Sequence, residues 1–231
     1  MKRIGLIGGL SWYSSIEYYR ILNLLTEEHL GAHHQGNIVL VNVNLHEFRT
    51  LLNRDDTSRA IDLLISAAKT LESAGCDLIL LCSNGVHQFF CQVEDSITTE
   101  MLHIADATAI AIQEQKIVKV GLLGVKSTME EGFYQKRSSK FNIEIMIPDP
   151  EDCDLIEQII FRELVQGSFI DSSRDSLIQI INNLQTKGAK GVILGCTEIP
   201  LLITQNHVHL PVFSTTNLHC KFAFSKAISQ T

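Results

Sequence analysis

The chain of 231 residues carries 26 acidic and 19 basic side chains, for a net charge of −7, and 45% of its residues are apolar. This composition excludes a disordered chain and is typical of a globular protein with one large or two small domains. An acidic balance without a basic patch argues against nucleic acid as a partner, and no apolar run approaches the roughly 18 to 20 residues of a membrane-spanning helix.

Short apolar runs alternate along the chain with segments of helical periodicity. The runs that predict strands are residues 3–7, 38–43, 77–82, 118–123, 143–147, 191–194 and 210–213. Apolar side chains recur at three- and four-residue spacing, which predicts helices, over residues 14–30, 58–74, 153–166, 173–187 and 217–229. Strands that alternate with helices predict right-handed βαβ units and mostly parallel sheets covered on both faces.

The chain also matches itself in two places. The segment "KRIGLIGGLS" resembles "VKVGLLGVKS" 116 residues later, and "GCDLILLCSN" resembles "GAKGVILGCT" 113 residues later. These matches suggest two related α/β halves, although any two strand–helix turns share part of the pattern, so duplication and coincidence both stay open. In related halves Ser83 corresponds to Cys196, and both follow strands at their carboxyl ends, where ligands bind in open α/β sheets.

The cysteines bear on compartment, metal binding and chemistry. Six cysteines show neither a CxxC pair nor a dense framework, which favours reduced thiols and a cytoplasmic location. The nine histidines are scattered, and no His, Cys or carboxylate cluster has the spacing of a metal site, so we expect no metal. In "LLCSNGVH" the self-match that sets Ser83 over Cys196 predicts that Ser83 is the functional position and that Cys82 points into the core.

Seven motifs follow one another in "GLIGGLSWYSSIEYYRILN", "LCSNGVH", "LHIADAT", "GLLGVKSTMEEGFY", "IPDPEDCDLIEQIIFREL", "GVILGCTEIPLLI" and "LPVFSTTNLHCKFA". In order and spacing they resemble the aspartate/glutamate racemase family over essentially the whole chain, and the bacterial aspartate/glutamate racemases more than the cell-wall glutamate racemases. The resemblance implies two pseudo-symmetric Rossmann-like domains, residues 1–99 with 207–231 and residues 100–206, with the active site in the cleft between them. It also implies a homodimer that acts on an acidic amino acid without pyridoxal phosphate or any other cofactor.

The resemblance further implies which residues act. Racemisation needs one group to remove the α-proton from one face and another to return a proton to the other, and Cys196 and Ser83 hold these positions. In the family the cysteine of the C-terminal half takes the proton from the L-isomer. Both residues lie where strands open into helices, whose N–H groups favour a thiolate. The substrate-binding residues that the resemblance implies are Ser11, Asn84, Gly85, Ser127, Thr128, Thr197 and Glu198.

Several positions depart from the family pattern. Ser83 stands where Cys, or Thr in a close branch, is usual, and a hydroxyl is much less acidic than a thiol. Gly85 replaces a Thr, Leu52 replaces a side chain that is often polar, Lys126 replaces an Arg, and Ser214 replaces an Asp. These departures affect the second proton-transfer group, at Ser83, and the residues that would determine which substrate binds.

Other readings of the same residues stay open. Ser83 and Asn84 are also suited to cap a helix, Cys196 to fill a small apolar space, and Glu198 to position a neighbour. For the whole protein the alternatives to a racemase are two. One is an amino-acid-binding or regulatory protein with weakened catalysis. The other is an enzyme similar to the arylmalonate decarboxylases, in which one cysteine suffices because decarboxylation needs a single protonation.

Overall fold

The computed structural model describes residues 1–229 of the chain. The chain divides into two compact units: the first holds Met1–His103 and the residues from His219 onward, and the second holds Ile104–Leu218. Each unit contains one four-stranded parallel sheet, with strand orders β2-β1-β3-β4 and β6-β5-β7-β8. The predicted fold class, two α/β domains with parallel sheets, is therefore confirmed.

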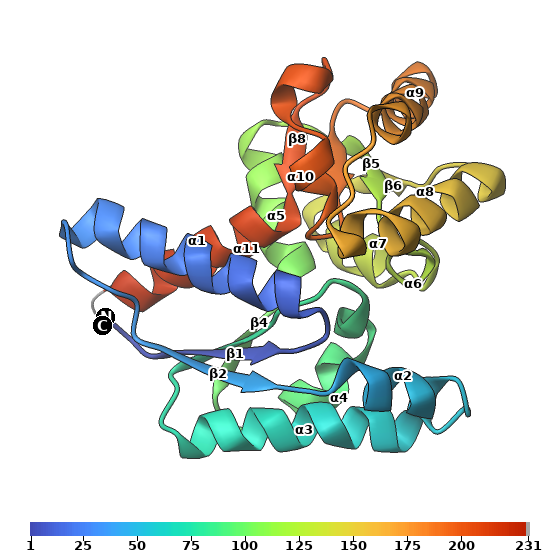
Figure 1. Ribbon diagram of the computed structural model, residues 1–231. Helices are drawn as coiled ribbons and strands as arrows, with labels where there is room; N and C mark the ends of the chain where they lie inside the picture. Colours follow the sequence, from blue (N-terminus) through green and yellow to red (C-terminus); the bar gives the residue numbers. More distant parts are fainter. Residues whose placement is uncertain (230–231) are drawn as a thin grey trace. The chain divides into compact units, whose positions relative to one another are not determined.

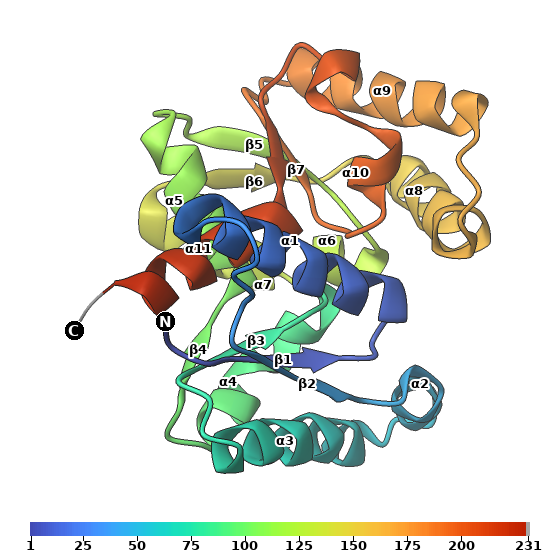
Figure 2. The same cartoon turned by 60° about the vertical axis from the view of Figure 1, so that its left-hand side comes forward.

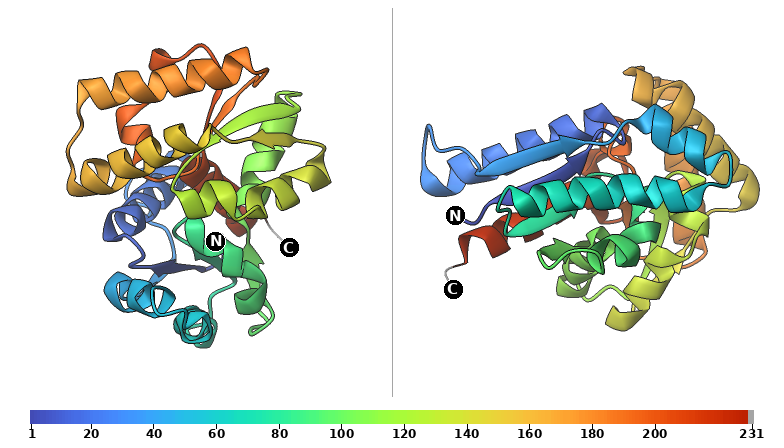
Figure 3. Two further views of the ribbon diagram at one scale, coloured as in Figure 1. Left: turned by 90° about the vertical axis from the view of Figure 1, so that its right-hand side faces the viewer. Right: turned by 90° about the horizontal axis from the view of Figure 1, so that it is seen from below.

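The first unit is a sheet between two helical layers. Its strands are β1 (Ile4–Gly8), β2 (Ile38–Asn42), β3 (Leu78–Leu81) and β4 (Glu100–Leu102). Its helices are α1 (Trp12–Leu30), α2 (Leu45–Leu52), α3 (Thr57–Ser73), the 3-10 helix η1 (Gly85–Phe89), α4 (Phe90–Glu94) and the later part of α11 (Thr215–Ile228). Figure 1 shows α1 over one face of the sheet and α3 over the other, and the right-hand view of Figure 3 shows α3 lying along its face.

Side chains of β3 alternate between these two layers. Leu78 and Leu80 pack in one cluster with Tyr18 of α1, whereas Ile79 and Leu81 pack in another with residues of α3. Because both faces are covered, all four residues of the strand are buried, which explains its continuous apolar run.

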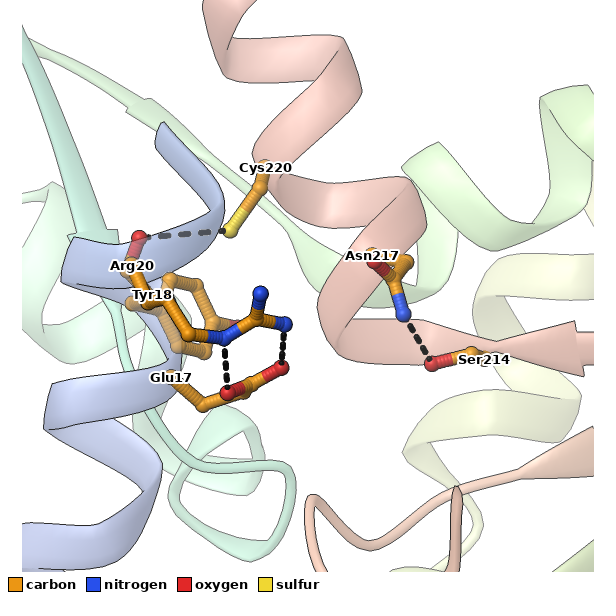
Figure 4. Close-up of polar contacts among 6 residues, drawn as sticks. All are labelled: Glu17, Tyr18, Arg20, Ser214, Asn217 and Cys220. Atoms are coloured by element: carbon orange, nitrogen blue, oxygen red, sulfur yellow. Dashed lines mark hydrogen bonds and ion pairs between the residues drawn. The ribbon is translucent and has the colours of Figure 1, made fainter. Parts of the chain in front are cut away.

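Helix α11 joins α1 on the first face of this sheet. Ala223 and Phe224 of α11 belong to the same apolar cluster as Tyr18 of α1. Near the middle of the contact, the Cys220 thiol lies 4.0 Å from the Tyr18 carbonyl oxygen (Figure 4). The last helix of the chain is thus part of the first unit's core.

The second unit repeats this arrangement of strands. Its strands are β5 (Lys119–Leu123), β6 (Glu144–Met146), β7 (Val192–Leu194) and β8 (Val212–Ser214). Its helices are α5 (Ile104–Glu114), α6 (Lys126–Glu130), α7 (Phe133–Ser138), η2 (Ser139–Phe141), α8 (Pro150–Arg162), η3 (Leu164–Gln166), α9 (Asp171–Thr186), α10 (Ile199–Leu202), η4 (Gln205–His207) and the first turn of α11. Figures 2 and 3 show α8 and α9 side by side. Helix α9 packs closely on β5, because a Cβ on Gly121 would lie only 2.7 Å from Cδ1 of Leu184.

The register of the two sheets agrees with the internal matches of the sequence. Ile7 of β1 pairs with Leu81 of β3, and Leu123 of β5 pairs with Leu194 of β7. Leu123 follows Ile7 by 116 residues and Leu194 follows Leu81 by 113, the two offsets at which the sequence matches itself. The two units therefore share topology and register.

The structure differs from the sequence predictions mainly at the borders of the units. The contacts place these borders after His103 and after Leu218, whereas the sequence predicted them after residues 99 and 206. Strand β8 explains the second difference, because it pairs with β7 and so lies in the second sheet. Strand β4 was not predicted, since it has only three residues and begins with the exposed Glu100.

Candidate active site

The carboxyl ends of β1 and β3 bring four of the predicted residues to one edge of the first sheet. Ser11 follows β1, and Ser83, Asn84 and Gly85 follow β3, which pairs directly with β1. Ser83 and Gly85 are half-buried, and Asn84 is buried. Cys82 is 1% exposed and lies in the core, as predicted, and burial raises the pKa of its thiol well above the usual range. Of these two neighbours, Ser83 is the one that a ligand can reach.

Two of these residues also begin helices. Ser11 is the N-cap of the long helix α1, where its hydroxyl accepts a hydrogen bond from the Ser14 N–H at 3.5 Å. Asn84 precedes η1 without capping it through its side chain. Capping therefore accounts for Ser11 but not for the side chain of Asn84.

The paired glycines Gly8, the last residue of β1, and Gly9 form a tight turn. Gly9 has a φ of +80°, and a Cβ at this position would lie 2.2 Å from the Val43 carbonyl oxygen, so only glycine fits. The Gly9 N–H donates to the Ser15 hydroxyl at 2.8 Å. The "GG" motif thus holds the end of β1 against the end of β2, and positions the start of α1.

The carboxyl ends of β5 and β7 form the corresponding edge of the second sheet. Ser127 and Thr128 follow β5, and Cys196, Thr197 and Glu198 follow β7, which pairs with β5. Ser127, Cys196 and Thr197 are half-buried, whereas Glu198 is 4% exposed. The structure therefore brings these five predicted residues together at one edge of the second unit's sheet.

Cys196 has a carboxyl group as its immediate partner. Its thiol donates to Oε2 of Glu198 at 2.9 Å, and the Thr197 hydroxyl donates to the same oxygen at 2.6 Å. Glu198 is thereby fixed between a thiol and a hydroxyl. All three residues were predicted from the sequence, but their hydrogen bonds were not, because side-chain hydrogen bonds within a turn leave no periodic signal.

This geometry keeps Cys196 in its thiol form, contrary to the thiolate that the sequence analysis expected. Burial raises the pKa of the thiol well above its usual range, and the charge and hydrogen bond of Glu198 raise it further. Backbone N–H groups at Glu198 and Ile199 act in the opposite direction, as predicted for a helix start, but are the smaller effect. Cys196 is therefore a proton donor at rest, with a proton acceptor already bonded to it.

The two strand ends of the second unit approach closely because of Gly195. A Cβ there would lie 2.9 Å from the Leu123 carbonyl oxygen and 3.2 Å from Cγ2 of Thr128. Thr128 is fully buried, with its methyl group under this turn, and among residues 1–229 its hydroxyl has no hydrogen-bond partner. Thr128 therefore packs beneath the turn that carries Cys196. Its neighbour Ser127 is half-buried, so part of that side chain is accessible.

The end of β8 adds polar groups beside β7. The Asn217 side-chain amide donates to the Ser214 hydroxyl at 3.0 Å (Figure 4), and the Thr215 hydroxyl donates to the Leu194 carbonyl oxygen at 3.0 Å. The sequence predicted a strand here but assigned it to the other domain, so Thr215 and Asn217 were not considered with Cys196. Because strand ends of a parallel sheet lie at one edge, the correct assignment of β8 would have found them.

Two basic side chains, Lys126 and Arg49, follow strands of these sheets. Lys126, which follows β5, forms an ion pair with Asp154 of α8, and this partner raises the pKa of the lysine. Its charge is thus partly balanced within the unit. Arg49 is exposed on α2, directly after the carboxyl end of β2, and the sequence analysis missed it because it predicted no helix there.

Among the described residues, no three His, Cys, Asp or Glu side chains are placed to hold a metal ion. Within the same part of the chain, no helix combines the length and apolar character needed to cross a membrane.

Comparison with known proteins identifies the family. A family model described as Asp/Glu/Hydantoin racemase matches residues 7–223. The chain belongs to this racemase family.

Relatives of known structure agree with this membership. A candidate Asp/Glu racemase from Yersinia pestis is 41% identical, with a TM-score of 0.93 over 99% of this chain and 100% of its own. An aspartate racemase homologue from Pyrococcus horikoshii is 33% identical, with a TM-score of 0.89 over 99% of this chain and 100% of its own. The broad-specificity amino-acid racemase RacX of Bacillus subtilis is 23% identical over 165 residues, 71% of this chain and 70% of its own length. Family and neighbours together support a racemase enzyme.

Proposed function

We propose that this protein racemises an acidic amino acid, aspartate or glutamate, by proton transfer at the α-carbon. The observation that carries the proposal is the 2.9 Å hydrogen bond from the Cys196 thiol to Glu198 at the end of β7. A half-buried thiol beside a proton acceptor, in a turn after a strand, supports a general acid–base role for this cysteine.

The first half-reaction uses this pair. When the L-isomer binds, the Cys196 proton passes to Glu198, and the resulting thiolate removes the α-proton. A new S–H bond forms as the Cα–H bond breaks, and the electron pair stays on the substrate, delocalised into its α-carboxylate. Glu198 acts as the acceptor that makes a high-pKa thiol usable as a base.

The second half-reaction uses the other strand end. We assign Ser83 to the opposite face of the α-carbon, where a water molecule held by its hydroxyl delivers the proton. Glu198 then releases its proton to solvent, which balances the proton taken from water. Because a hydroxyl is a much weaker acid than a thiol, this half-reaction is the slower one.

The substrate carboxylates need hydrogen-bond donors from the protein. We propose that they bind to the residues of the two strand-end sets, with hydroxyl, amide and backbone N–H groups that also stabilise the charge that develops on the substrate. These residues are Ser11, Asn84, Gly85, Ser127 and Thr197, with Glu198 as the partner of the thiol, whereas the buried Thr128 supports the turn of Cys196 from beneath. The choice of an acidic substrate rests on the family and on the names of the Yersinia and Pyrococcus relatives.

The proposal includes the absence of pyridoxal phosphate and metal, a homodimeric state and a cytoplasmic location. Dialysis against a chelator should leave activity unchanged, and added pyridoxal phosphate should not raise it. Light scattering after size exclusion should give twice the mass of the 25.8 kDa chain.

The test is incubation with single L- and D-amino acids in deuterated water, followed by proton NMR and chiral chromatography. We expect loss of the α-proton signal and formation of the opposite isomer for aspartate or glutamate. No exchange with either isomer of either amino acid would contradict the proposal.

A second candidate function is favoured by Ser83 itself. A single thiol is sufficient for decarboxylation of a disubstituted malonic acid, because the carbanion left after loss of carbon dioxide needs one protonation. Release of carbon dioxide from such acids, without exchange of amino-acid α-protons, would favour this enzyme. Binding of aspartate or glutamate by calorimetry, without either reaction, would indicate an amino-acid-binding protein.

A further inference from the structure

Three buried histidines meet in the core of the first unit, and one of them, His87, follows Ser83 by four residues. His87 lies on η1, His103 follows β4, and His219 lies on α11, and they are 2%, 4% and 0% exposed. The ring centroid of His87 lies 4.7 Å from that of His103 and 5.7 Å from that of His219. The proposed reaction uses none of them, although imidazole is a versatile proton carrier.

Their hydrogen bonds define which ring nitrogens carry protons. A carbonyl oxygen only accepts, so Nε2 of His219, 2.9 Å from the Leu102 oxygen, is the protonated nitrogen, and its Nδ1 accepts from the Tyr18 hydroxyl at 2.9 Å. By the same reasoning Nδ1 of His87, 2.8 Å from the Ser83 carbonyl oxygen, carries a proton and donates it. One of the three rings therefore holds the backbone of Ser83.

The whole turn after β3 is held through its carbonyl groups. The Ser14 hydroxyl donates to the Cys82 oxygen, and the His87 ring donates to the Ser83 oxygen. The next two oxygens accept from the His87 backbone N–H at 3.0 Å and from the Gln88 side chain at 2.9 Å. Four successive carbonyl groups are thus fixed, and the one that belongs to Ser83 depends on an imidazole.

Packing holds this imidazole in place. Phe90 stacks on His87 with a centroid distance of 5.9 Å and an interplanar angle of 10°. Phe90 also packs on His103, at 4.6 Å. With rings on several sides, His87 cannot turn away from the Ser83 carbonyl without disturbing the core.

We propose that His87 is a positioning residue for Ser83: its buried ring, clamped by His103, His219 and Phe90, fixes the backbone from which the Ser83 hydroxyl reaches the substrate. This inference rests on the proposed function, in which Ser83 serves only the second face of the α-carbon. A group held in the productive geometry is worth much more than a mobile one, and a displacement of about 1 Å can lower a rate about 100-fold.

The test compares two variants of nearly equal shape. In His87→Asn the amide nitrogen stands at the same distance from Cβ as Nδ1 of histidine and can donate to the Ser83 carbonyl group, whereas His87→Leu has the same branching without a donor. Both leave a similar cavity, so their difference reports the hydrogen bond. We expect His87→Leu to lower inversion of the L-isomer by about 10- to 100-fold and His87→Asn to stay within a few-fold of the parent.

The α-hydrogen exchange of the L-isomer is the internal control, because it depends on Cys196 in the other unit. In His87→Leu we expect it to change by less than about twofold, so that the ratio of inversion to exchange falls. A proportional fall of both rates in His87→Leu would show a general loss of folded protein and overturn the proposal, as would unchanged inversion in that variant.

Backbone amide exchange of residues 83–87, followed by mass spectrometry, tests the turn without substrate. Faster deuterium uptake in His87→Leu than in both the parent and His87→Asn supports the proposal, and equal uptake in the two variants overturns it. If the parent exchanges no acidic amino acid, the proposed function fails, and the amide measurement still decides whether His87 holds the turn.

Discussion

The turns after β3 and β7 occupy equivalent places in the two units, but their side chains and hydrogen bonds differ. After β7, the Cys196 thiol donates to a carboxyl group two residues along the chain. After β3, the side chain is the hydroxyl of Ser83, and its own backbone carbonyl group accepts from the ring of His87. One turn therefore supplies a reactive group with a proton partner, and the other supplies a weaker group with a rigid backbone.

This difference predicts an enzyme with unequal faces. A thiol ionises near pH 8.5 in water, many orders of magnitude more readily than a serine hydroxyl. Exchange at the Cys196 face should then be faster than net inversion, since a proton removed from the L-isomer can return to the same face.

The largest effect is expected from Cys196→Ala. Loss of the thiol removes the general base for the L-isomer, and a positioned proton-transfer group typically contributes about 100- to 10,000-fold. Both exchange and inversion should fall by at least this factor in the NMR assay, whereas Cys91→Ala, which removes an exposed thiol, should have no effect. Exchange of L- and D-isomers at equal, rapid rates that survives in Cys196→Ala would show that the base has been misassigned.

The second prediction concerns a substitution that gives both turns a thiol. Ser83→Cys places a thiol on the second face, and we expect the ratio of inversion to exchange to rise by about 10- to 100-fold, provided that the turn accepts the larger sulfur atom. Chiral chromatography and NMR on the same samples give this ratio. Ser83→Ala is the matched control, and the asymmetry would be refuted if it inverted the substrate as fast as the parent.

The third prediction separates the acidity of Cys196 from its catalytic use. In Glu198→Gln the charge that helps to raise the pKa of the thiol is lost, so iodoacetamide should label Cys196 at lower pH than in the parent. The proton acceptor is lost as well, and exchange should fall about 10-fold or more despite the more acidic thiol. Mass spectrometry locates the label, and Thr197→Val, which keeps the carboxyl group, should change exchange less. A parallel rise of labelling and exchange would mean that Glu198 restrains Cys196 rather than assisting it.

Sequence patterns predicted much of this arrangement because both strand ends follow strongly apolar runs. The self-match predicted the equivalence of the β3 and β7 positions, and through it correctly predicted a buried Cys82. Strand β4 and helix α2 were missed, since short elements carry little periodicity. The bond from Cys196 to Glu198 and the meeting of His87 with His103 and His219 depend on side-chain geometry and on contacts between distant segments, which no local pattern records.

The smallest predicted effect concerns the stability of the first unit, not its chemistry. Burial lowers the pKa of His219 from 6.5 to about 4, because a charged imidazole would lose its hydration in the core. Between these two values the unfolded chain binds a proton that the folded chain does not, so stability is complete above pH 6.5 and decreases as the pH falls toward 4. From this residue alone we expect a loss of about 1 kcal/mol between about pH 7.5 and pH 5.5.

Urea unfolding of the parent and of His219→Gln at these two pH values measures this effect. The glutamine amide can still donate to the Leu102 carbonyl group but does not titrate, so the variant should lose about 1 kcal/mol less than the parent over the same interval. His34→Gln, which replaces an exposed histidine, is the control and should follow the parent. An identical pH dependence in the parent and in His219→Gln would mean that the buried ring is protonated as easily in the core as in water. The apolar enclosure that keeps the His219 ring uncharged beside His87 would then not exist.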